Sequence, residues 1–325
     1  MLVTLPSSPF RTANSAPLRP DKFRDPRLTA DGAPRASVAL TDLTTLWFNT
    51  GTLCNIACAT CYIESSPRND ALAYLSAADV RGYLDEIASL GLKTREIGFT
   101  GGEPFMNREI IPMIEAALEG GFEVLVLTNA MKPIRRWEAA LTDLSQRYGD
   151  RLTLRVSLDH HTAAIHEAER GPETWAPAIE GLSWLAANGF AIAVAGRLLP
   201  GESEIQARAG YGLLFDVLSL PVRADDPAQL VLFPEMDAAV DVPEITEACW
   251  GILDKSPAAM MCASSRMVVK RKGHVHPAVV ACTLTPYDPQ FELGGSLAQA
   301  LGRVHLNHPH CAKFCVLGGA SCSVS

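Results

Sequence analysis

The stretch CNIACATCY, residues 54–62, decides how this chain is interpreted. Its three cysteines, Cys54, Cys58 and Cys61, have the spacing CxxxCxxC. That spacing offers three thiolates to an iron–sulfur cluster and leaves one iron without a protein ligand. A [4Fe–4S] cluster held by four cysteines mainly carries electrons, whereas one held by three has an open iron that can bind a small molecule. The motif therefore indicates a cluster that can bind and activate a small molecule as well as store an electron.

A zinc site and a disulfide are the alternatives for these cysteines. A structural zinc site needs four ligands and usually combines paired CxxC units or cysteine with histidine. No histidine lies near the motif, and the next cysteine is Cys249. A disulfide would leave one thiol over and suits an exported protein better. An iron–sulfur cluster is thus the favoured interpretation.

Length and composition bound the possibilities. The chain has 325 residues, of which 48% are hydrophobic, which suits one large α/β domain with a small appendage. The formal net charge of -8 argues against a broad nucleic-acid-binding face. No apolar run reaches transmembrane length, and the N-terminus has no apolar core suited to a signal peptide. We therefore expect a cytoplasmic protein without a membrane partner, whose nine cysteines serve metal rather than disulfides.

Outward from the cysteine motif, short apolar stretches alternate with helical patterns. The predicted strands are 44–49, 96–99, 123–128, 152–158, 190–195 and 230–233. Helices are predicted after caps at Ser76 and Asn107, and over about 134–148, 174–188 and 202–218. Six strands with intervening helices imply right-handed crossovers and a parallel sheet. The expected fold is α/β, a partial (β/α)6 TIM-like barrel with a small C-terminal cysteine-rich cluster-binding domain.

The chain divides into three parts by composition. Residues 1–40 are rich in Pro, Arg, Asp, Ser and Ala and lack periodicity, so we expect an extended or disordered lead-in. Residues 41–245 hold the barrel pattern. Residues 246–325 hold six of the nine cysteines and few helix signals, which indicates a small appendage stapled by metal.

Three motifs fall at the carboxyl ends of predicted strands, where barrels of this type gather functional residues. The cysteine motif follows the first strand, TGGEP (100–104) follows the second, and VSLD (156–159) ends the fourth. In this order the three motifs resemble the radical S-adenosylmethionine (radical SAM) superfamily, and the resemblance covers about residues 44–233. The pair of CxxxCxxC and GGEP is highly specific, whereas a Gly-Gly dipeptide alone would be weak.

The resemblance implies a reaction. Cys54, Cys58 and Cys61 would bind three irons of a [4Fe–4S] cluster, and SAM would chelate the fourth. The reduced cluster would pass one electron to the sulfonium, giving methionine and a 5′-deoxyadenosyl radical that abstracts hydrogen from a substrate. A reductase or a flavodoxin- or ferredoxin-type protein would supply the electron.

The resemblance also implies a set of SAM-binding residues. Tyr62 would contact adenine, although packing under the loop is an equal alternative. The GGEP loop would approach the SAM ammonium, and Arg170 would pair with the SAM carboxylate unless it is a surface arginine. Asp159 would face the ribose or the substrate, or else cap a turn. The full set is Tyr62, Gly101, Gly102, Glu103, Asn129, Ser157, Asp159 and Arg170, with Arg197 a weaker candidate.

The C-terminal cysteines suggest a second cluster. Cys262 and Cys282 flank a predicted hairpin with Gly273 at its turn, and three more cysteines follow. The arrangement resembles the auxiliary-cluster extensions called SPASM and twitch domains. It implies one auxiliary [4Fe–4S] cluster, with zinc as the alternative metal. The expected ligands are Cys262, Cys282, Cys311 and Cys315, with Cys322 the alternative fourth. The histidines at 305, 308 and 310 are expected in an exposed loop, or else one of them serves the metal.

Two classes of function compete. The first is a radical SAM enzyme acting on a small molecule or a peptide, with net oxidation or radical bond formation as the expected outcome. The second is a non-enzymatic iron–sulfur electron carrier or scaffold, which would need the cysteines but not Gly101, Gly102 and Glu103. An RNA-modifying enzyme is disfavoured by the acidic charge.

Overall fold

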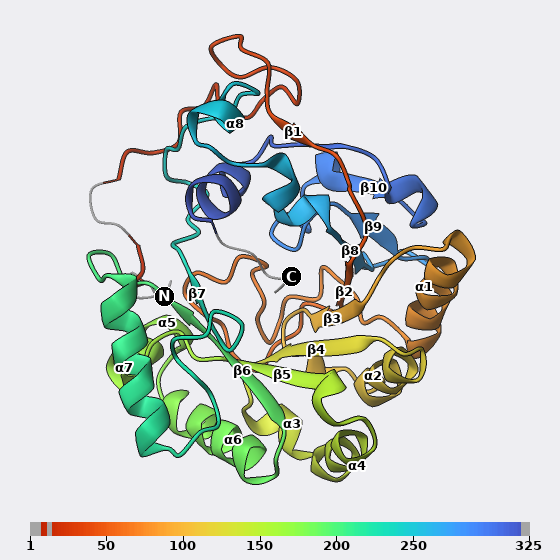
Figure 1. The fold of residues 1–325 in the computed structure, drawn as a ribbon, viewed down its shortest axis with the longest axis vertical. Coiled ribbons are helices and arrows are strands. Elements are labelled where there is room, and N and C mark those ends of the chain that lie inside the picture. Colours follow the sequence, from red (N-terminus) through yellow and green to blue (C-terminus); the bar gives the residue numbers. More distant parts are fainter. Residues whose placement is uncertain (1–7, 12–14, 320–325) are drawn as a thin grey trace.

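The computed structural model describes residues 8–11 and 15–319. Its main feature is a nine-stranded sheet of order β10-β9-β8-β2-β3-β4-β5-β6-β7, curled so that helices cover the outer face of its parallel part (Figure 1). Six consecutive strands pair in parallel, which confirms the predicted partial barrel. They are β2 (Thr45–Asn49), β3 (Glu96–Thr100), β4 (Glu123–Thr128), β5 (Leu152–Ser157), β6 (Ala191–Arg197) and β7 (Leu230–Phe233).

The helices follow the predicted pattern in most places and differ from it in a few. They are α1 (Ala77–Leu90), α2 (Ile110–Glu119), α3 (Lys132–Arg135), α4 (Glu138–Tyr148), α5 (Ala163–Arg170), α6 (Trp175–Ala187), α7 (Glu204–Val217) and α8 (Cys249–Ile252). Ser76 caps α1 through a capping box with Asp79, as expected. Asn107 is not the cap of α2, because that helix begins after Glu109; the Asn107 side chain accepts the Glu109 N–H instead.

The helix predicted over 134–148 is two helices. Arg136 and Trp137 lie at the break, and both donate side-chain hydrogen bonds to the carbonyl of Phe105 in the turn after β3. The eight-residue helix α5 was not predicted, because it buries His166 and Glu169 instead of an apolar stripe. Hydrophobic periodicity therefore could not reveal it.

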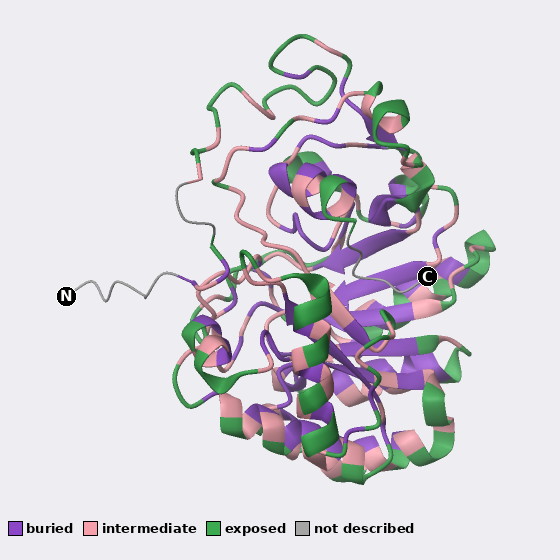
Figure 2. Ribbon diagram, turned by 60° about the vertical axis from the view of Figure 1, so that its left-hand side comes forward, coloured by how far each residue is buried: buried purple, intermediate pink, exposed green. Residues whose placement is uncertain are grey.

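The C-terminal region continues the barrel sheet. Strand β8 (Ser265–Val269) pairs in parallel with β2, and β9 (Ala278–Val280) and β10 (Glu292–Gly294) follow as antiparallel neighbours. The predicted hairpin is confirmed, and Gly273 has a φ of 82° at its turn. The strands are buried along most of their length, while the helices turn exposed residues outward (Figure 2).

The lead-in, expected to be extended or disordered, has mostly irregular backbone over its described part, 15–40, but it packs against later parts of the chain. Strand β1 (Ser37–Val38) pairs with β11 (Val304–His305), and the Leu18 N–H donates to the Ala239 carbonyl. Arg35 is buried and forms an ion pair with Glu244 at 2.5 Å. Main-chain pairing and a buried ion pair order this segment without any periodic apolar pattern. The predictions for 1–7, 12–14 and Cys322 fall outside the described residues.

Within the described ranges, no helix is both long and apolar enough to cross a membrane.

Candidate active site

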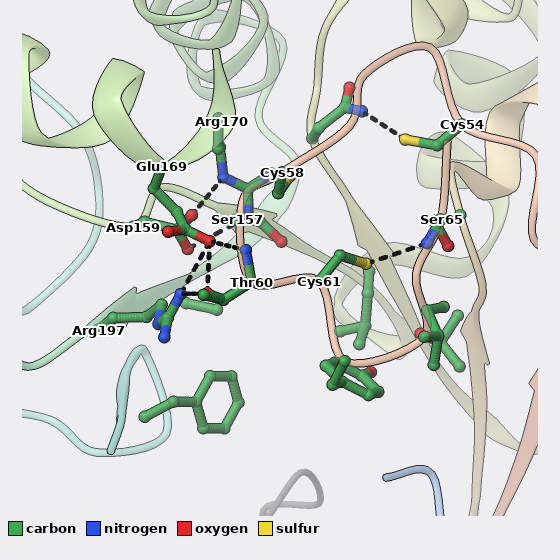
Figure 3. A pocket seen from close by; sticks show the side chains of 18 of the residues that line it. Cys54, Cys58, Thr60, Cys61, Ser65, Ser157, Asp159, Glu169, Arg170 and Arg197 are labelled. Atoms are coloured by element: carbon green, nitrogen blue, oxygen red, sulfur yellow. Dashed lines mark hydrogen bonds and ion pairs between the residues drawn. The ribbon is translucent and has the colours of Figure 1, made fainter. Parts of the chain in front are cut away.

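A cavity of about 160 Å³ opens at the carboxyl ends of the parallel strands. All three cysteines of the opening motif line it (Figure 3). So do seven of the eight residues that the sequence assigned to SAM: Tyr62, Gly101, Gly102, Asn129, Ser157, Asp159 and Arg170. Loops that are far apart in the sequence thus contribute to one space, as the positions of the motifs at strand ends predicted.

The cysteines are held away from water. Cys54 is buried and Cys58 and Cys61 are partly buried. Burial raises the pKa of Cys54 to about 11 and that of Cys58 to about 12. Thiolates are the form that binds metal, so iron would displace these protons. Three soft sulfur ligands on one short loop fit an iron–sulfur cluster with an open iron.

The two glycines of the GGEP loop allow it to lie directly against the cysteine loop. A Cβ at Gly101 would lie 2.5 Å from the Gly51 carbonyl oxygen, and one at Gly102 would lie 2.2 Å from that of Leu53. The two backbones are joined by hydrogen bonds from Gly102 N–H to Gly51 and from Glu103 N–H to Leu53. The glycines therefore position the cysteine loop, and a close approach to SAM stays a prediction.

Glu103 differs from its expected role, because its carboxylate lies beside the cavity rather than in its lining. One oxygen accepts hydrogen bonds from Phe105 N–H at 3.1 Å and Thr128 Oγ1 at 2.9 Å; the other accepts one from Asn129 N–H at 2.8 Å. Burial raises the pKa of this carboxyl to about 7. The carboxylate therefore fixes Asn129, whose side chain donates to Asn55 in the cysteine loop at 2.9 Å.

Asp159 and Arg170 form an ion pair in the cavity wall. The Arg170 Nε lies 2.8 Å from Asp159 Oδ2, and a second bond of 3.3 Å reaches Oδ1. Burial alone would raise the pKa of Asp159, but the guanidinium of Arg170 holds it below its usual range. Arg170 is therefore neither a surface residue nor free of partners, and the pair presents one cation and one anion to the cavity.

Sequence reasoning missed Glu169, which holds the middle of the cysteine loop. Its carboxylate accepts hydrogen bonds from Thr60 N–H at 2.9 Å and Thr60 Oγ1 at 2.6 Å, and it pairs with Arg197 at 3.0 Å (Figure 3). Its own carbonyl accepts the Ala59 N–H at 2.7 Å. A glutamate at the end of a short helix resembles a surface residue. The nearest signal was its place beside Arg170 in the segment HEAERGP.

Two histidines beside this site, His160 and His161, approach the carboxylate of Glu202 in a group that could resemble a metal site. His160 Nδ1 accepts the Thr162 N–H at 3.0 Å, which assigns the proton of the neutral ring to Nε2. That nitrogen faces Glu202 at 3.7 Å. That separation is too long for a hydrogen bond, and His160 Nε2 has no hydrogen-bond partner among the described residues.

A second cavity, of about 20 Å³, is lined by the other predicted cysteine ligands. Cys262, Cys282, Cys311 and Cys315 all line it, and most of the remaining lining is Met, Leu, Val and Phe. Burial raises the pKa of Cys262 to about 11 and that of Cys311 well above its usual range. Cys249 lies outside this cavity, with its sulfur 3.4 Å from the Thr246 nitrogen.

The histidines before Cys311 do not form an exposed loop, contrary to expectation. His310 is buried, lines the second cavity, and leaves Nδ1 without a hydrogen-bond partner among the described residues. Burial lowers the pKa of His310 to about 3, so the ring is neutral. Its place beside the cysteines keeps open the predicted contact with a metal or a cluster sulfur.

Arg266 places a positive charge beside the same cysteines. It is 1% exposed, and its guanidinium donates to the carbonyls of Cys262, Ser265, Ala300 and Gly302. In the described part of the chain it forms no ion pair with a carboxylate. A buried cation is costly unless an anion balances it, and thiolates at Cys262 and Cys282 would do so.

Comparisons with known proteins agree with this geometry. A sequence model described as the radical SAM superfamily matches residues 48–209. The antilisterial bacteriocin subtilosin biosynthesis protein AlbA of Bacillus subtilis is 30% identical over 143 residues, which are 44% of this chain and 30% of AlbA. Mycofactocin maturase MftC of Mycobacterium ulcerans is 30% identical over 138 residues, 42% of this chain and 35% of that protein. The matches span about a third of each of these curated relatives.

Solved structures show the same fold at low identity. SuiB of Streptococcus suis bound to S-adenosylmethionine has a TM-score of 0.55 at 13% identity, over 78% of this chain and 63% of SuiB. Native anSMEcpe with bound AdoMet has a TM-score of 0.56 at 13% identity, over 79% of this chain and 80% of that one. With its motifs gathered around one cavity and its sequence matching the family over residues 48–209, the chain belongs to the radical SAM superfamily.

Proposed function

We propose that this protein reductively cleaves SAM and uses the resulting 5′-deoxyadenosyl radical to abstract hydrogen from a peptide. The observation that supports this most is the shared cavity. Three thiols line it together with a buried cation, a buried carboxylate and backbone from the GGEP loop. An electron carrier would need the thiols but would have no use for a roomy polar space beside them.

The chain's own residues divide the work of binding. Cys54, Cys58 and Cys61 would hold the cluster, which when bound supplies one electron to the sulfonium. Arg170 offers its cation to the SAM carboxylate while Asp159 keeps it oriented.

The remaining lining residues set the position of SAM. Tyr62 offers a ring face for adenine, and Ser157 points into the same space as Asp159 because the side-chain period of a strand is two. Asn129 borders the cavity and is fixed by Glu103.

A peptide is the proposed substrate class. AlbA is described as a bacteriocin biosynthesis protein and MftC as a maturase. SuiB, which has the same fold, has been solved bound to the precursor peptide SuiA. A small molecule is the alternative substrate, and turnover with candidate peptides distinguishes the two.

The second cavity would hold an auxiliary [4Fe–4S] cluster with Cys262, Cys282, Cys311 and Cys315 as ligands. Four cysteines complete the coordination of such a cluster, and the small apolar cavity leaves no room for a substrate. The cluster would therefore accept an electron from the product radical, which supports net oxidation. Zinc is the alternative metal, and Cys322 the alternative ligand. A reductase or a flavodoxin- or ferredoxin-type protein would reduce the first cluster.

The test is anaerobic reconstitution with iron and sulfide, followed by dithionite and SAM. The expected result is 5′-deoxyadenosine, detected by mass spectrometry, and none from a Cys58→Ala variant. Absence of 5′-deoxyadenosine from iron-loaded wild-type protein would overturn the proposal in favour of an electron carrier. Iron content and the electron paramagnetic resonance (EPR) spectrum of the second site separate an iron–sulfur cluster from zinc.

A further inference from the structure

Two residues near the N-terminus pack behind the active-site wall. Phe10 is fully buried, and the Arg197 guanidinium lies 4.3 Å from the centre of its ring. Ser8 is also buried, and its hydroxyl donates to Glu169 Oε2 at 2.5 Å. Ser8 further accepts the Phe10 N–H at 3.2 Å, which holds the two residues in one turn. Neither of them lines the cavity, so any effect on it passes through Glu169 and Arg197.

These contacts add to a buried ion pair in which Arg197 Nε has no hydrogen-bond partner among the described residues. The Glu169 and Arg197 side chains are only 1% and 7% exposed, and a buried pair stabilises only when its remaining donors and acceptors are satisfied. Ser8 supplies the donor for the carboxylate oxygen that faces away from Arg197. The ring of Phe10 covers the guanidinium, where a desolvated cation–π contact is strongest.

The ion pair in turn holds the cysteine loop. Arg197 donates to Thr60 Oγ1 at 2.6 Å, and Glu169 binds the backbone of Ala59 and Thr60. These two residues lie between Cys58 and Cys61, so their position sets where both sulfurs lie. A shift of the loop would move the cluster relative to Arg170 and the rest of the SAM site.

We propose that Ser8 and Phe10 are positioning residues of the SAM site, acting through Glu169 and Arg197 on the loop that carries Cys58 and Cys61. The inference rests on the proposed function, because it concerns the same cluster and SAM. The segment 8–11 would then help to position the active site, although its composition predicted only an extended or disordered lead-in.

The chain contains a matched control for this contact. Phe23 packs over Arg35 at 5.4 Å, and Arg35 pairs with Glu244, so one phenylalanine again covers the arginine of a buried ion pair. That pair joins the N-terminal segment to residues after β7 and, in the described part of the chain, forms no hydrogen bond or ion pair with the cysteine loop. Phe23→Ala therefore removes the same kind of contact away from the cavity.

The experiment compares Phe10→Ala, Phe23→Ala, Ser8→Ala and Ser8→Thr as anaerobically reconstituted full-length proteins. Equilibrium dialysis measures the affinity for SAM, and EPR of the reduced protein measures the cluster signal with and without SAM. Phe10→Ala should weaken SAM binding by about tenfold and change the SAM-induced EPR shift. Ser8→Ala should weaken it by about threefold, and Ser8→Thr should restore it because the hydroxyl remains.

Phe23→Ala should leave both readouts as in wild type, even where it lowers the melting temperature. Equal SAM affinity and equal EPR spectra for Phe10→Ala and Phe23→Ala would overturn the inference. Iron-loaded wild type that neither binds SAM nor shows an EPR change would instead overturn the proposed function. The two failures are therefore distinguishable, and neither depends on knowing the substrate.

Discussion

The two cysteine groups of this protein differ in the segments that supply them and in the size and lining of the cavities beside them. The first lies in one loop after β2, beside a cavity of about 160 Å³ with an ion pair in its wall. The second is assembled from separate segments around β8 and β9, and its cavity of about 20 Å³ is mainly apolar. Cysteine spacing alone indicates a metal, whereas the surroundings decide whether a ligand can join it. The first site has room for a charged ligand and the second has not.

The largest expected effect separates the two sites by removing the first. Cys58→Ala should abolish formation of 5′-deoxyadenosine, because the open iron is lost with the cluster. The protein should lose about four irons and keep those of the second site. Iron analysis and mass spectrometry of the reaction check this. Residual 5′-deoxyadenosine at the wild-type rate would mean that SAM is cleaved elsewhere.

Removing the second site should have a narrower effect. Cys282→Ala should also cost about four irons, while SAM is still cleaved to 5′-deoxyadenosine, because this cavity does not share the SAM site. The oxidised product should disappear, since its electron has no acceptor. Cys249→Ala is the matched control, because its thiol lies outside the cavity and its loss should leave the iron content unchanged. Full yield of oxidised product from Cys282→Ala would exclude an electron-accepting role.

The fold and much of the first site could be predicted because their signals are local. Each strand of the barrel is a short apolar run, and each motif follows a strand directly, so position in the sequence implies position in space. The pairing of β8 with β2 could not be predicted, because the hairpin signal says nothing about which strand lies beside it. A parallel partner is chosen by the packing of the whole sheet.

The site residues that the sequence did not predict were missed for a different reason. Ser8 and Glu169 are 161 positions apart in the sequence, and each alone resembles a surface residue. Their burial follows from contacts between distant segments, which no local pattern records. Glu103 is the opposite case: its motif was recognised from the sequence, but its hydrogen bonds to the chain's own Thr128 and Asn129 were not predicted. A sequence motif can be recognised without showing which groups its side chains bind, and only the structure shows those partners.

The first site also buries the acidic side chain of Glu103, which should show in the pH dependence of the protein's stability. Burial raises the pKa of Glu103 from 4.5 to about 7. A raised pKa gives stability that is present below the unfolded value and lost as the pH rises through the folded one. This residue alone should therefore lower the free energy of unfolding of the apoprotein by about 3 kcal/mol between pH 4 and pH 8.

Urea unfolding of wild type and Glu103→Gln at both pH values isolates this effect. The variant keeps the side-chain shape but cannot ionise, so the difference between the two proteins cancels the contributions of other groups such as Asp159. The same pH dependence in both proteins would show that Glu103 is not the group responsible.

The smallest expected effect concerns the basic charge at the second site. Arg266 is buried against the Cys262 carbonyl, and reduction adds negative charge to a cluster beside it. Arg266→Met should therefore lower the midpoint potential of the second cluster by several tens of millivolts, because a nearby cation favours the reduced form. Arg266→Lys keeps the charge and should keep the potential near that of wild type. EPR-monitored redox titration measures both clusters in one sample, and the first should not move. An equal shift of the midpoint potential in both clusters would point to a general structural change. A shift confined to the second cluster would show that this arginine balances the charge of a cluster whose ligands are all cysteines.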